Sequence, residues 1–206
     1  MVFDLPPPDP AVVVSIASRG MSKGISQTNG PQLLAKGSLR FGDVQLGAQW
    51  KNVSSTSAKG EGAAFTTVSH KFGALQVSGG IAWKFQTGVR RKTDSTSIEL
   101  SAAASRKLGP VSLQANAIYS PDDLGSARRS LFVEAGPAVQ LGSGWTASAA
   151  LGHRSREQGT DYTAFNAGVT KSIRWLQLDL RYYDTNRSDV GSPYRTRIVG
   201  SARLSF

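Results

Sequence analysis

Basic side chains recur along this 206-residue sequence in segments where polar and apolar residues alternate; the formal net charge is +10 and the pI is near 10.2. In an extended strand every second side chain points to the same face, so residues of one parity share an environment. A face rich in positive charge attracts anions. Three acidic residues, Glu99, Glu134 and Asp179, share the polar parity with thirteen basic ones: Arg19, Lys36, Arg40, Lys51, Lys71, Lys84, Lys107, Arg154, Arg156, Arg181, Arg195, Arg197 and Arg203.

Residues suited to catalysis are few. The sequence has no Cys and two His, of which His153 lies close to Ser155 and Asp161, the one place where a Ser–His–acid arrangement could form. Cys and His do not occur at metal-ligand spacing, and no phosphate-binding loop or dinucleotide fingerprint is present. We therefore expect no catalytic residue, no metal site and no cofactor, and we expect His70 and His153 to be interfacial.

Strands must position the basic residues, because alternation with period two runs through the chain without helical periodicity of useful length. Residues 11–206 are predicted to form one domain, preceded by an extended Pro-rich leader over residues 1–10. The number of strands depends on how residues 19–30 fold. The predicted strands are 11–23, 32–41, 44–53, 62–72, 75–86, 96–108, 111–120, 131–141, 145–156, 162–173, 175–185 and 195–206.

Short and long connections alternate between these strands. The short ones are "FGD", "FGA", "LGP", "LGSG" and "IR", and the long ones include "SSTSAKGEG", "SPDDLGSARRS" and "NRSDVGSPY". Alternate connections of an up-and-down barrel lie at opposite ends, and outer-membrane barrels have short periplasmic turns and longer external loops. The sequence therefore predicts an all-β, transmembrane, antiparallel barrel of about twelve strands with both termini in the periplasm.

The apolar parity is nearly free of charge, as in "WLQLDLRYYDTN", where Leu176, Leu178, Leu180 and Tyr182 alternate with polar residues. A soluble sandwich would bury this side, whereas a membrane barrel would turn it toward acyl chains. Aromatic residues near both strand ends favour the membrane, since aromatic girdles mark the two lipid–water interfaces. The girdle at the short-turn end comprises Phe41, Phe72, Trp145, Trp175 and Phe206, and that at the long-loop end comprises Trp50, Trp83, Phe85, Tyr119 and Tyr182.

Several stretches resemble the TorF family of small Gram-negative outer-membrane porins. "SKGISQTNGPQLLAKGSLRFGDVQLGAQWKNV" is similar to the family's first strands, with Lys23 where the family usually has Arg, and "NAIYSPDDLG", "GTDYTAFNAGV" and "LRYYDTN" are similar to later ones. The chain ends in "RLSF", and Phe206 with Leu204 resembles the C-terminal signal read by the barrel-assembly machinery. The resemblance implies a bacterial outer-membrane location. Its motifs are structural, so it carries over no site residue.

Three functions are compatible with a barrel whose lumen is basic. The favoured one is passive diffusion of small solutes, with a preference for anions because a narrow, low-dielectric lumen focuses the field. The alternative is a barrel whose inward charges pair and fill it, leaving a structural or partner-binding role for the loops. A rim enzyme using His153, Ser155 and Asp161 is the third.

Nucleic-acid binding is disfavoured, because the basic residues and most aromatic residues fall on opposite faces. The expected partners are outer-membrane lipid, lipopolysaccharide, small anionic solutes and, through Phe206, the assembly machinery. The loop residues Arg90, Arg91, Lys92, Arg128 and Arg129 either face lipopolysaccharide phosphates or are simply solvated.

Overall fold

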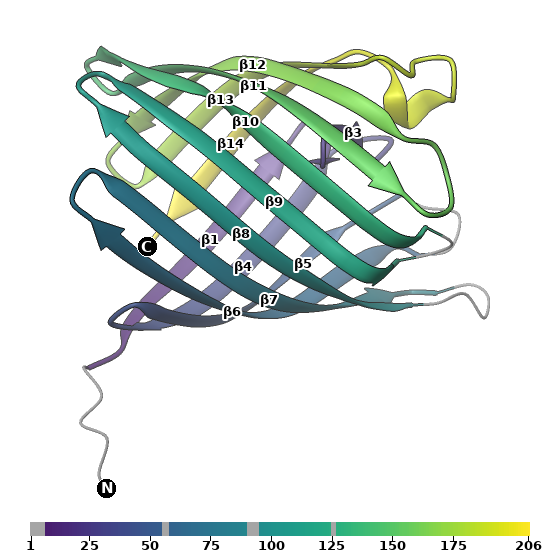
Figure 1. Ribbon diagram of the computed structural model, residues 1–206, viewed down its shortest axis with the longest axis horizontal. Coiled ribbons are helices and arrows are strands. Elements are labelled where there is room, and N and C mark those ends of the chain that lie inside the picture. The colour runs from purple at the N-terminus through teal and green to yellow at the C-terminus, as the bar shows by residue number, and fades with distance from the viewer. Residues whose placement is uncertain (1–6, 55–57, 90–94, 125–126) are drawn as a thin grey trace, which may run out of the picture.

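The computed structural model describes residues 7–54, 58–89, 95–124 and 127–206 and is a closed barrel of antiparallel strands (Figure 1). Neighbouring strands follow the chain order, and β1 pairs with both β4 and β14 to close the ring. The expected all-β, up-and-down, twelve-stranded barrel is therefore confirmed. Its strands are β1 (Asp9–Ala17), β4 (Gln32–Phe41), β5 (Val44–Asn52), β6 (Gly60–Phe72), β7 (Leu75–Thr87), β8 (Thr96–Leu108), β9 (Val111–Asp123), β10 (Arg128–Gly142), β11 (Trp145–Arg156), β12 (Tyr162–Ile173), β13 (Leu176–Thr185) and β14 (Arg197–Ser205).

Three further elements complete the described structure: β2 (Met21–Ser22) and β3 (Ile25–Ser26), which pair only with each other, and the single helical turn η1 (Ser192–Tyr194). No helix in the described ranges is long and apolar enough to span a membrane.

The connections differ at the two ends of the barrel, as the sequence predicts. Five two-residue turns, at 42–43, 73–74, 109–110, 143–144 and 174–175, lie at one end, and the longer connections lie at the other (Figure 1). The start of β1 and the end of β14 lie beside the short turns, where Val12 and Phe206 exchange backbone hydrogen bonds of 3.0 and 2.9 Å. An even number of strands in a meander requires this placement.

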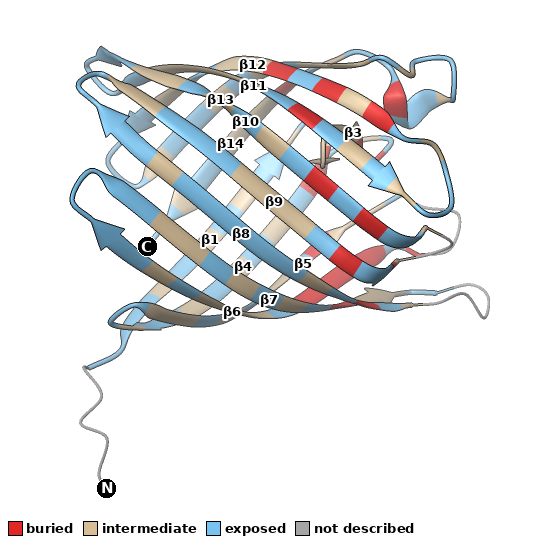
Figure 2. Ribbon diagram, viewed as in Figure 1, coloured by how far each residue is buried: buried red, intermediate tan, exposed pale blue. Residues whose placement is uncertain are grey.

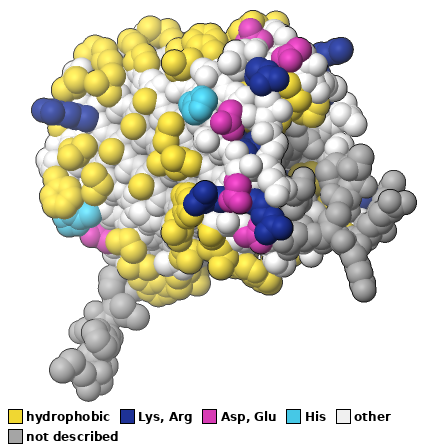
Figure 3. Space-filling view, turned by 45° about the vertical axis from the view of Figure 1, so that its right-hand side comes forward, with side chains coloured by type: hydrophobic (Ala, Val, Ile, Leu, Met, Phe, Trp, Pro, Cys, Tyr) yellow, Lys and Arg dark blue, Asp and Glu magenta, His cyan; other side chains and the backbone are white. Residues whose placement is uncertain are grey.

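The outer wall is apolar and exposed. Leu180 is 55% exposed and Ile198 is 71% exposed, whereas the inward side chains of Asp179 and Arg181 are only 21% and 16% exposed. Figure 3 shows hydrophobic side chains spread over the visible wall, with charged side chains toward its ends. A water-soluble sheet protein buries its large apolar residues, so this inverted pattern fits a wall surrounded by acyl chains.

Burial is uneven along the barrel. The buried positions of the strands gather in the half nearest the long connections, and the half nearest the short turns is mostly intermediate or exposed (Figure 2). The lumen is therefore more densely filled in the half nearest the long connections than in the half nearest the short turns.

Several strand predictions differ from the structure at their ends, and the first and last strands differ in ways that matter for the lumen. The first strand was expected over 11–23, but β1 begins at Asp9, inside the expected leader, and ends at Ala17, after which the chain turns inward. The last strand was expected from residue 195, but η1 precedes it and β14 begins at Arg197. Pro193 favours the helical turn, since proline fits the first turn of a helix and has no N–H for a strand ladder. Residues 1–6 of the leader lie outside the described residues.

Candidate functional site

Residues 18–31 connect β1 to β4 and fold into the barrel. Within them β2 and β3 form a hairpin, called here the inner hairpin, whose two-residue turn is Lys23–Gly24. Both turn residues have positive φ, 50° and 81°, as a type I′ turn requires. From the sequence, the first strand was expected to run to residue 23 and "ISQTNGP" was expected to be a loop, so the inner hairpin was not predicted.

Two acidic side chains of the barrel wall hold the tip of the inner hairpin. Lys23 Nζ lies 2.6 Å from Glu99 Oε1 and 3.5 Å from Asp123 Oδ2, and its side chain is 7% exposed. On the opposite side, Tyr162 Oη donates a 2.6 Å hydrogen bond to the carbonyl oxygen of Lys23. The tip is thus held between β8 and β9 on one wall and β12 on another.

The rest of the hairpin also contacts the wall. Ile25 packs against the buried cluster of Tyr162, Ala164 and Tyr194. Lys51 Nζ donates a 2.6 Å hydrogen bond to Gln27 Oε1. These contacts explain the one-sided burial, since the hairpin occupies the half of the lumen nearest the long connections.

A cluster of paired charges surrounds the hairpin tip, and we call it the ion-pair cluster. Glu61 lies 3.2 Å from Lys51 and 3.1 Å from Lys84, and Lys84 is also 3.2 Å from Glu99. Asp123 additionally pairs with an Arg154 guanidinium nitrogen. The cluster holds four cations and three anions, so little net charge remains in this half of the lumen. Its members are Lys23, Lys51, Glu61, Lys84, Glu99, Asp123 and Arg154.

Sequence reasoning missed two of these carboxylates. Glu61 and Asp123 were assigned to loops, but β6 starts at Gly60 and β9 runs to Asp123, so both lie on the wall. They are 5% and 4% exposed. Parity could have found Glu61, which continues the inward alternation of β6. Asp123 has the outward parity of β9 and reaches the lumen because a β-bulge shifts the register between the pairs Ser130–Ser120 and Arg128–Asp123, so alternation gave no signal for it.

A second group of cations has no carboxylate partner within the described ranges. Arg40 and Arg203 both lie close enough to Lys36 to repel it, and Lys36 Nζ sits 4.5 Å from the centre of the Phe65 ring. We call these three residues the basic wall. They lie on β4 and β14, and Arg40 and Arg203 are exposed because they are near the end of the lumen that carries the short turns.

Two more arginines lie beside the basic wall, toward the long connections. Arg19 donates to the carbonyl oxygens of Thr28 and Asn29 at 3.1 and 3.0 Å, and Arg197 donates to Ser192. Neither forms an ion pair with a described residue. Arg195 was expected on the wall, but it precedes β14 and is exposed at the rim, because η1 delays the start of the strand.

The other predicted lumen residues have varied surroundings. Lys71 and Lys107 are exposed near the short turns. Arg156 donates to Tyr194 Oη at 2.9 Å, and Arg181 contacts Asp179 at 3.2 Å. Alternation predicted their parity, but it did not predict which of them would be paired.

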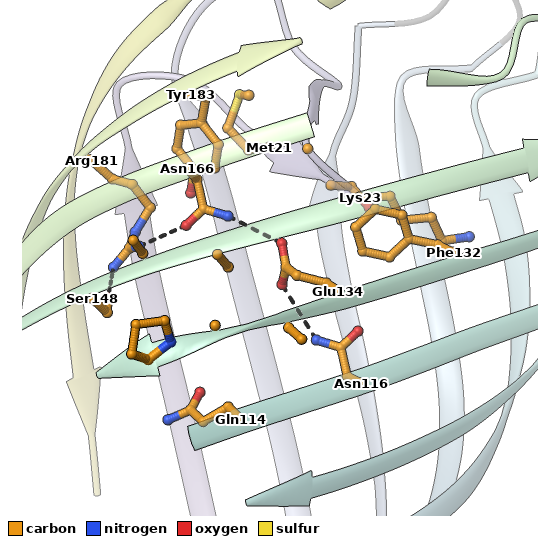
Figure 4. A pocket seen from close by; sticks show the side chains of 17 residues that line it. Met21, Lys23, Gln114, Asn116, Phe132, Glu134, Ser148, Asn166, Arg181 and Tyr183 are labelled. Carbon is orange, nitrogen blue, oxygen red and sulfur yellow. Dashed lines mark hydrogen bonds between the residues drawn. The ribbon is translucent and has the colours of Figure 1, made fainter. Parts of the chain in front are cut away.

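Three lumen cavities border the inner hairpin. One of about 360 Å³ lies between the hairpin and β9–β13 and is lined by Gln114, Asn116, Glu134, Asn166 and Tyr183, among others (Figure 4). A second of about 390 Å³ contains Arg19 and Arg203, and shares Met21, Arg181 and Tyr183 with the first. The third, of about 180 Å³, touches the ion-pair cluster.

The aromatic residues assigned to girdles lie near the strand ends. At the short-turn end Trp175 stacks on Phe206 with ring centres 6.0 Å apart, and Lys171 Nζ lies 5.0 Å from the Trp145 ring. At the other end Trp83 and Phe85 are 5.2 Å apart. Phe41, Phe72, Trp50, Tyr119 and Tyr182 complete the two sets, and all but Phe41 and Phe85 are exposed.

The rim residues do not form a catalytic triad. His153 Nδ1 lies 3.1 Å from Thr163 Oγ1, and Ser155 Oγ donates to Asp161 at 3.4 Å instead of bonding His153. Among the described residues no three His, Cys, Asp or Glu side chains gather as a metal site would require. Of the basic loop residues, Arg129 lies 3.7 Å from Glu157 and Arg128 is exposed, while Arg90, Arg91 and Lys92 lie outside the described residues.

Known structures of similar shape include outer-membrane porins and channels. The KdgM porin in complex with disordered oligogalacturonate has a TM-score of 0.68 at 10% identity, covering 95% of this chain and 99% of that one. The NanC porin has a TM-score of 0.62 at 11% identity over 94% and 97% of the two chains. The COG4313 outer membrane channel of Pseudomonas putida F1 has a TM-score of 0.56 at 14% identity over 95% and 94%.

At these identities the similarity shows the fold. The expected up-and-down antiparallel barrel is confirmed as a fold that this chain shares with these outer-membrane porins and channels. No family model and no curated protein matches the sequence, so membership of the TorF family stays a prediction.

Proposed function

We propose that this barrel is an outer-membrane channel for passive diffusion of small solutes and that it favours anions. The observation that supports this most directly is the basic wall. Lys36, Arg40 and Arg203 face the lumen without a carboxylate partner in the part of the chain that the structure describes, whereas the acidic residues around the hairpin tip are each paired. Unpaired cations in a narrow, low-dielectric passage raise the local concentration of anions.

The fold agrees with this proposal. Porins of the same shape include one solved with oligogalacturonate, a polyanion, and a basic lumen suits such a solute. The resemblance to the TorF family points the same way. As an outer-membrane channel, the barrel would have its long connections facing the cell exterior and both termini facing the periplasm. Arg128 and Arg129 would then lie near lipopolysaccharide phosphates. Phe206 would present the assembly signal.

A reversal-potential measurement tests the preference. Purified protein is inserted into planar bilayers with asymmetric KCl, and we expect a reversal potential of the sign set by chloride. The variant Lys36→Gln/Arg40→Gln/Arg203→Gln should lose most of that preference. Arg106→Gln/Lys171→Gln, which removes cations of the outward face, is the control and should behave like the unmodified protein. A cation-preferring reversal potential in the unmodified protein would refute the proposal.

A filled barrel with a structural or loop-binding role is the second candidate, because the inner hairpin and the ion-pair cluster occupy half of the lumen. Conductance separates the two candidates. Protein that shows heat-dependent gel mobility, and is therefore folded, but passes no current in bilayers would favour the filled barrel.

A further inference from the structure

Glu134 differs from the other carboxylates on the inner wall of the membrane-spanning strands. Glu61, Glu99, Asp123 and Asp179 each pair with a Lys or Arg, whereas Glu134 forms no ion pair with any described residue. Its contacts are two amides: Asn166 Nδ2 at 3.1 Å and Asn116 Nδ2 at 3.4 Å. A carboxylate without a cation, in a chain of net charge +10, is an acceptor with spare capacity.

The neighbouring side chains fix the orientation of both amides (Figure 4). Arg181 donates to Asn166 Oδ1 at 2.8 Å, which turns the nitrogen of Asn166 toward Glu134. Asn116 also directs its nitrogen to Glu134, so its oxygen points away and is buried without a hydrogen-bond donor from the described residues. A buried acceptor with no donor is costly, which makes it a site where a donor from a solute is favoured.

Glu134 and Asn116 both line the cavity of about 360 Å³ below the inner hairpin, and within it Asn116 Oδ1 is buried. That volume lies within the range of about 300–1,000 Å³ typical of small-molecule sites. Gln114, Ser148 and the Tyr183 hydroxyl add further polar groups to its wall. A ligand that offers several hydroxyl donors would satisfy Glu134 and Asn116 together.

The adjoining cavity supplies cationic hydrogen-bond donors in place of acceptors. It meets the first one at Met21, Arg181 and Tyr183, and it contains Arg19 and Arg203, neither of which is paired with a carboxylate among the described residues. A carboxylate on the same ligand would lie toward these guanidinium groups while its hydroxyls lie toward Glu134.

Resting on the proposed function, we infer that the two cavities form a solute-binding site for a hydroxylated carboxylate, a monomeric sugar acid, with the hydroxyls read by Glu134 and Asn116. Ammonium groups would also suit Glu134, so an amino acid is the competing ligand. The sugar acid fits better because the free acceptors belong to two side chains. Several hydroxyls reach both, whereas one ammonium is a point donor.

Three probes separate charge from hydroxyl recognition. Glucuronate carries both features, cyclohexanecarboxylate has the ring and the charge without hydroxyls, and glucose has hydroxyls without the charge. Binding is measured by isothermal titration calorimetry on the folded barrel in detergent, which needs no open channel. We expect glucuronate to bind about tenfold more tightly than either other probe, because each group adds hydrogen bonds that the other probes lack. Alanine, as a zwitterion, should bind no better than cyclohexanecarboxylate.

Two variants test which side chain binds the hydroxyls of the ligand and which binds its carboxylate. Glu134→Gln keeps the size of the side chain and should remove most of the advantage of glucuronate over cyclohexanecarboxylate. Arg203→Gln, the matched control in the other cavity, should weaken both carboxylates by a similar factor and preserve their ratio. Gel mobility before and after heating checks that each variant is folded.

The outcomes separate this site from the channel function. Equal binding of glucuronate and cyclohexanecarboxylate to the unmodified protein, or tighter binding of alanine, overturns the sugar-acid site whatever the conductance. Preferential glucuronate binding by a barrel that carries no current supports the site and refutes the channel. An equal weakening of both carboxylates in Glu134→Gln would overturn the assignment of Glu134 as the group that reads the hydroxyls.

Discussion

Replacing Lys23 by Met tests how the inner hairpin is held in the lumen. The side chain of Lys23 makes the ion pairs of the hairpin tip, at 2.6 Å to Glu99 and 3.5 Å to Asp123. Met keeps a similar length and removes the charge. Glu99 still pairs with Lys84, and Asp123 still pairs with Arg154, so the wall keeps balanced charges. The perturbation therefore acts on the hairpin rather than on the barrel.

The size of the effect follows from the ion pairs that Met cannot make. A hydrogen bond between charged groups contributes about 1.5–3 kcal/mol, so the ratio of released to docked hairpin should rise roughly ten- to a hundredfold. The bond from Tyr162 to the backbone of Lys23 and the packing of Ile25 remain. Release widens the lumen at the end nearest the long connections. We expect more frequent or longer visits to a state of higher conductance.

Single-channel recording at fixed voltage measures those visits. Lys171→Met is the control, because it removes a lysine from the outer wall, where Nζ donates to the carbonyl oxygen of Ser143. A second route to the same result is Glu99→Gln/Asp123→Asn, which leaves Lys23 without its anionic partners. If Lys23→Met is folded by gel mobility and its conductance states match those of Lys171→Met, then the ion pairs do not hold the hairpin.

Three further changes probe the hairpin turn, the strand pairing and the membrane face. Gly24→Ala should also release the hairpin, because a Cβ there would overlap Ala164 Cβ at a φ of 81°; adding Ala164→Gly should restore docking in part, as judged by the same recordings. Gly136→Ala should lower the urea concentration at which the folded gel band disappears, because the new Cβ would overlap the backbone oxygen of Ala149. The expected loss in the free energy of unfolding is about 1–3 kcal/mol. Gly200→Ala, where the added Cβ meets open space, is the control and should cost less. The four tryptophans of the girdles are exposed on the outer wall: Trp50 by 45%, Trp83 by 52%, Trp145 by 43% and Trp175 by 54%. Brominated lipids should therefore quench their fluorescence more strongly when the bromines lie near the headgroup than when they lie at the chain end. The reverse order would contradict the girdles.

The barrel itself could be predicted because its signals are local. Alternation fixes which side chains share a face, and a two-residue turn fixes the register of the strands on either side of it. The pairs Leu178–Ala202 and Leu180–Gly200 lie on the outer face, as the parity of "WLQLDLRYYDTN" indicates. The strand number and the arrival of β1 and β14 at the same end of the barrel follow from the same signals.

The inner hairpin could not be predicted, because its stabilising contacts are distant in the sequence. Lys23 reaches residues 76 and 100 positions away, and the hydrogen bond from Tyr162 spans 139 positions. From local sequence, residues up to 23 were predicted to end the first strand and "ISQTNGP" to form a loop. Gly24 was the available hint, since a Gly with positive φ after Lys23 makes a type I′ turn, but the same residues suit a turn outside the barrel.

The pairing of the lumen charges was also beyond the sequence, since parity assigns a face without assigning a partner. The structure divides the cations by position along the lumen. Near the long connections Lys51, Lys84 and Arg154 are neutralised by acidic residues and take part in holding the hairpin, whereas near the short turns Lys36 and Arg203 have no carboxylate partner among the described residues. The same excess of positive charge therefore has two physical consequences. Paired cations give up their long-range field in return for rigidity, and unpaired cations keep a field that acts on solutes, so the two halves of one lumen can differ in what they do.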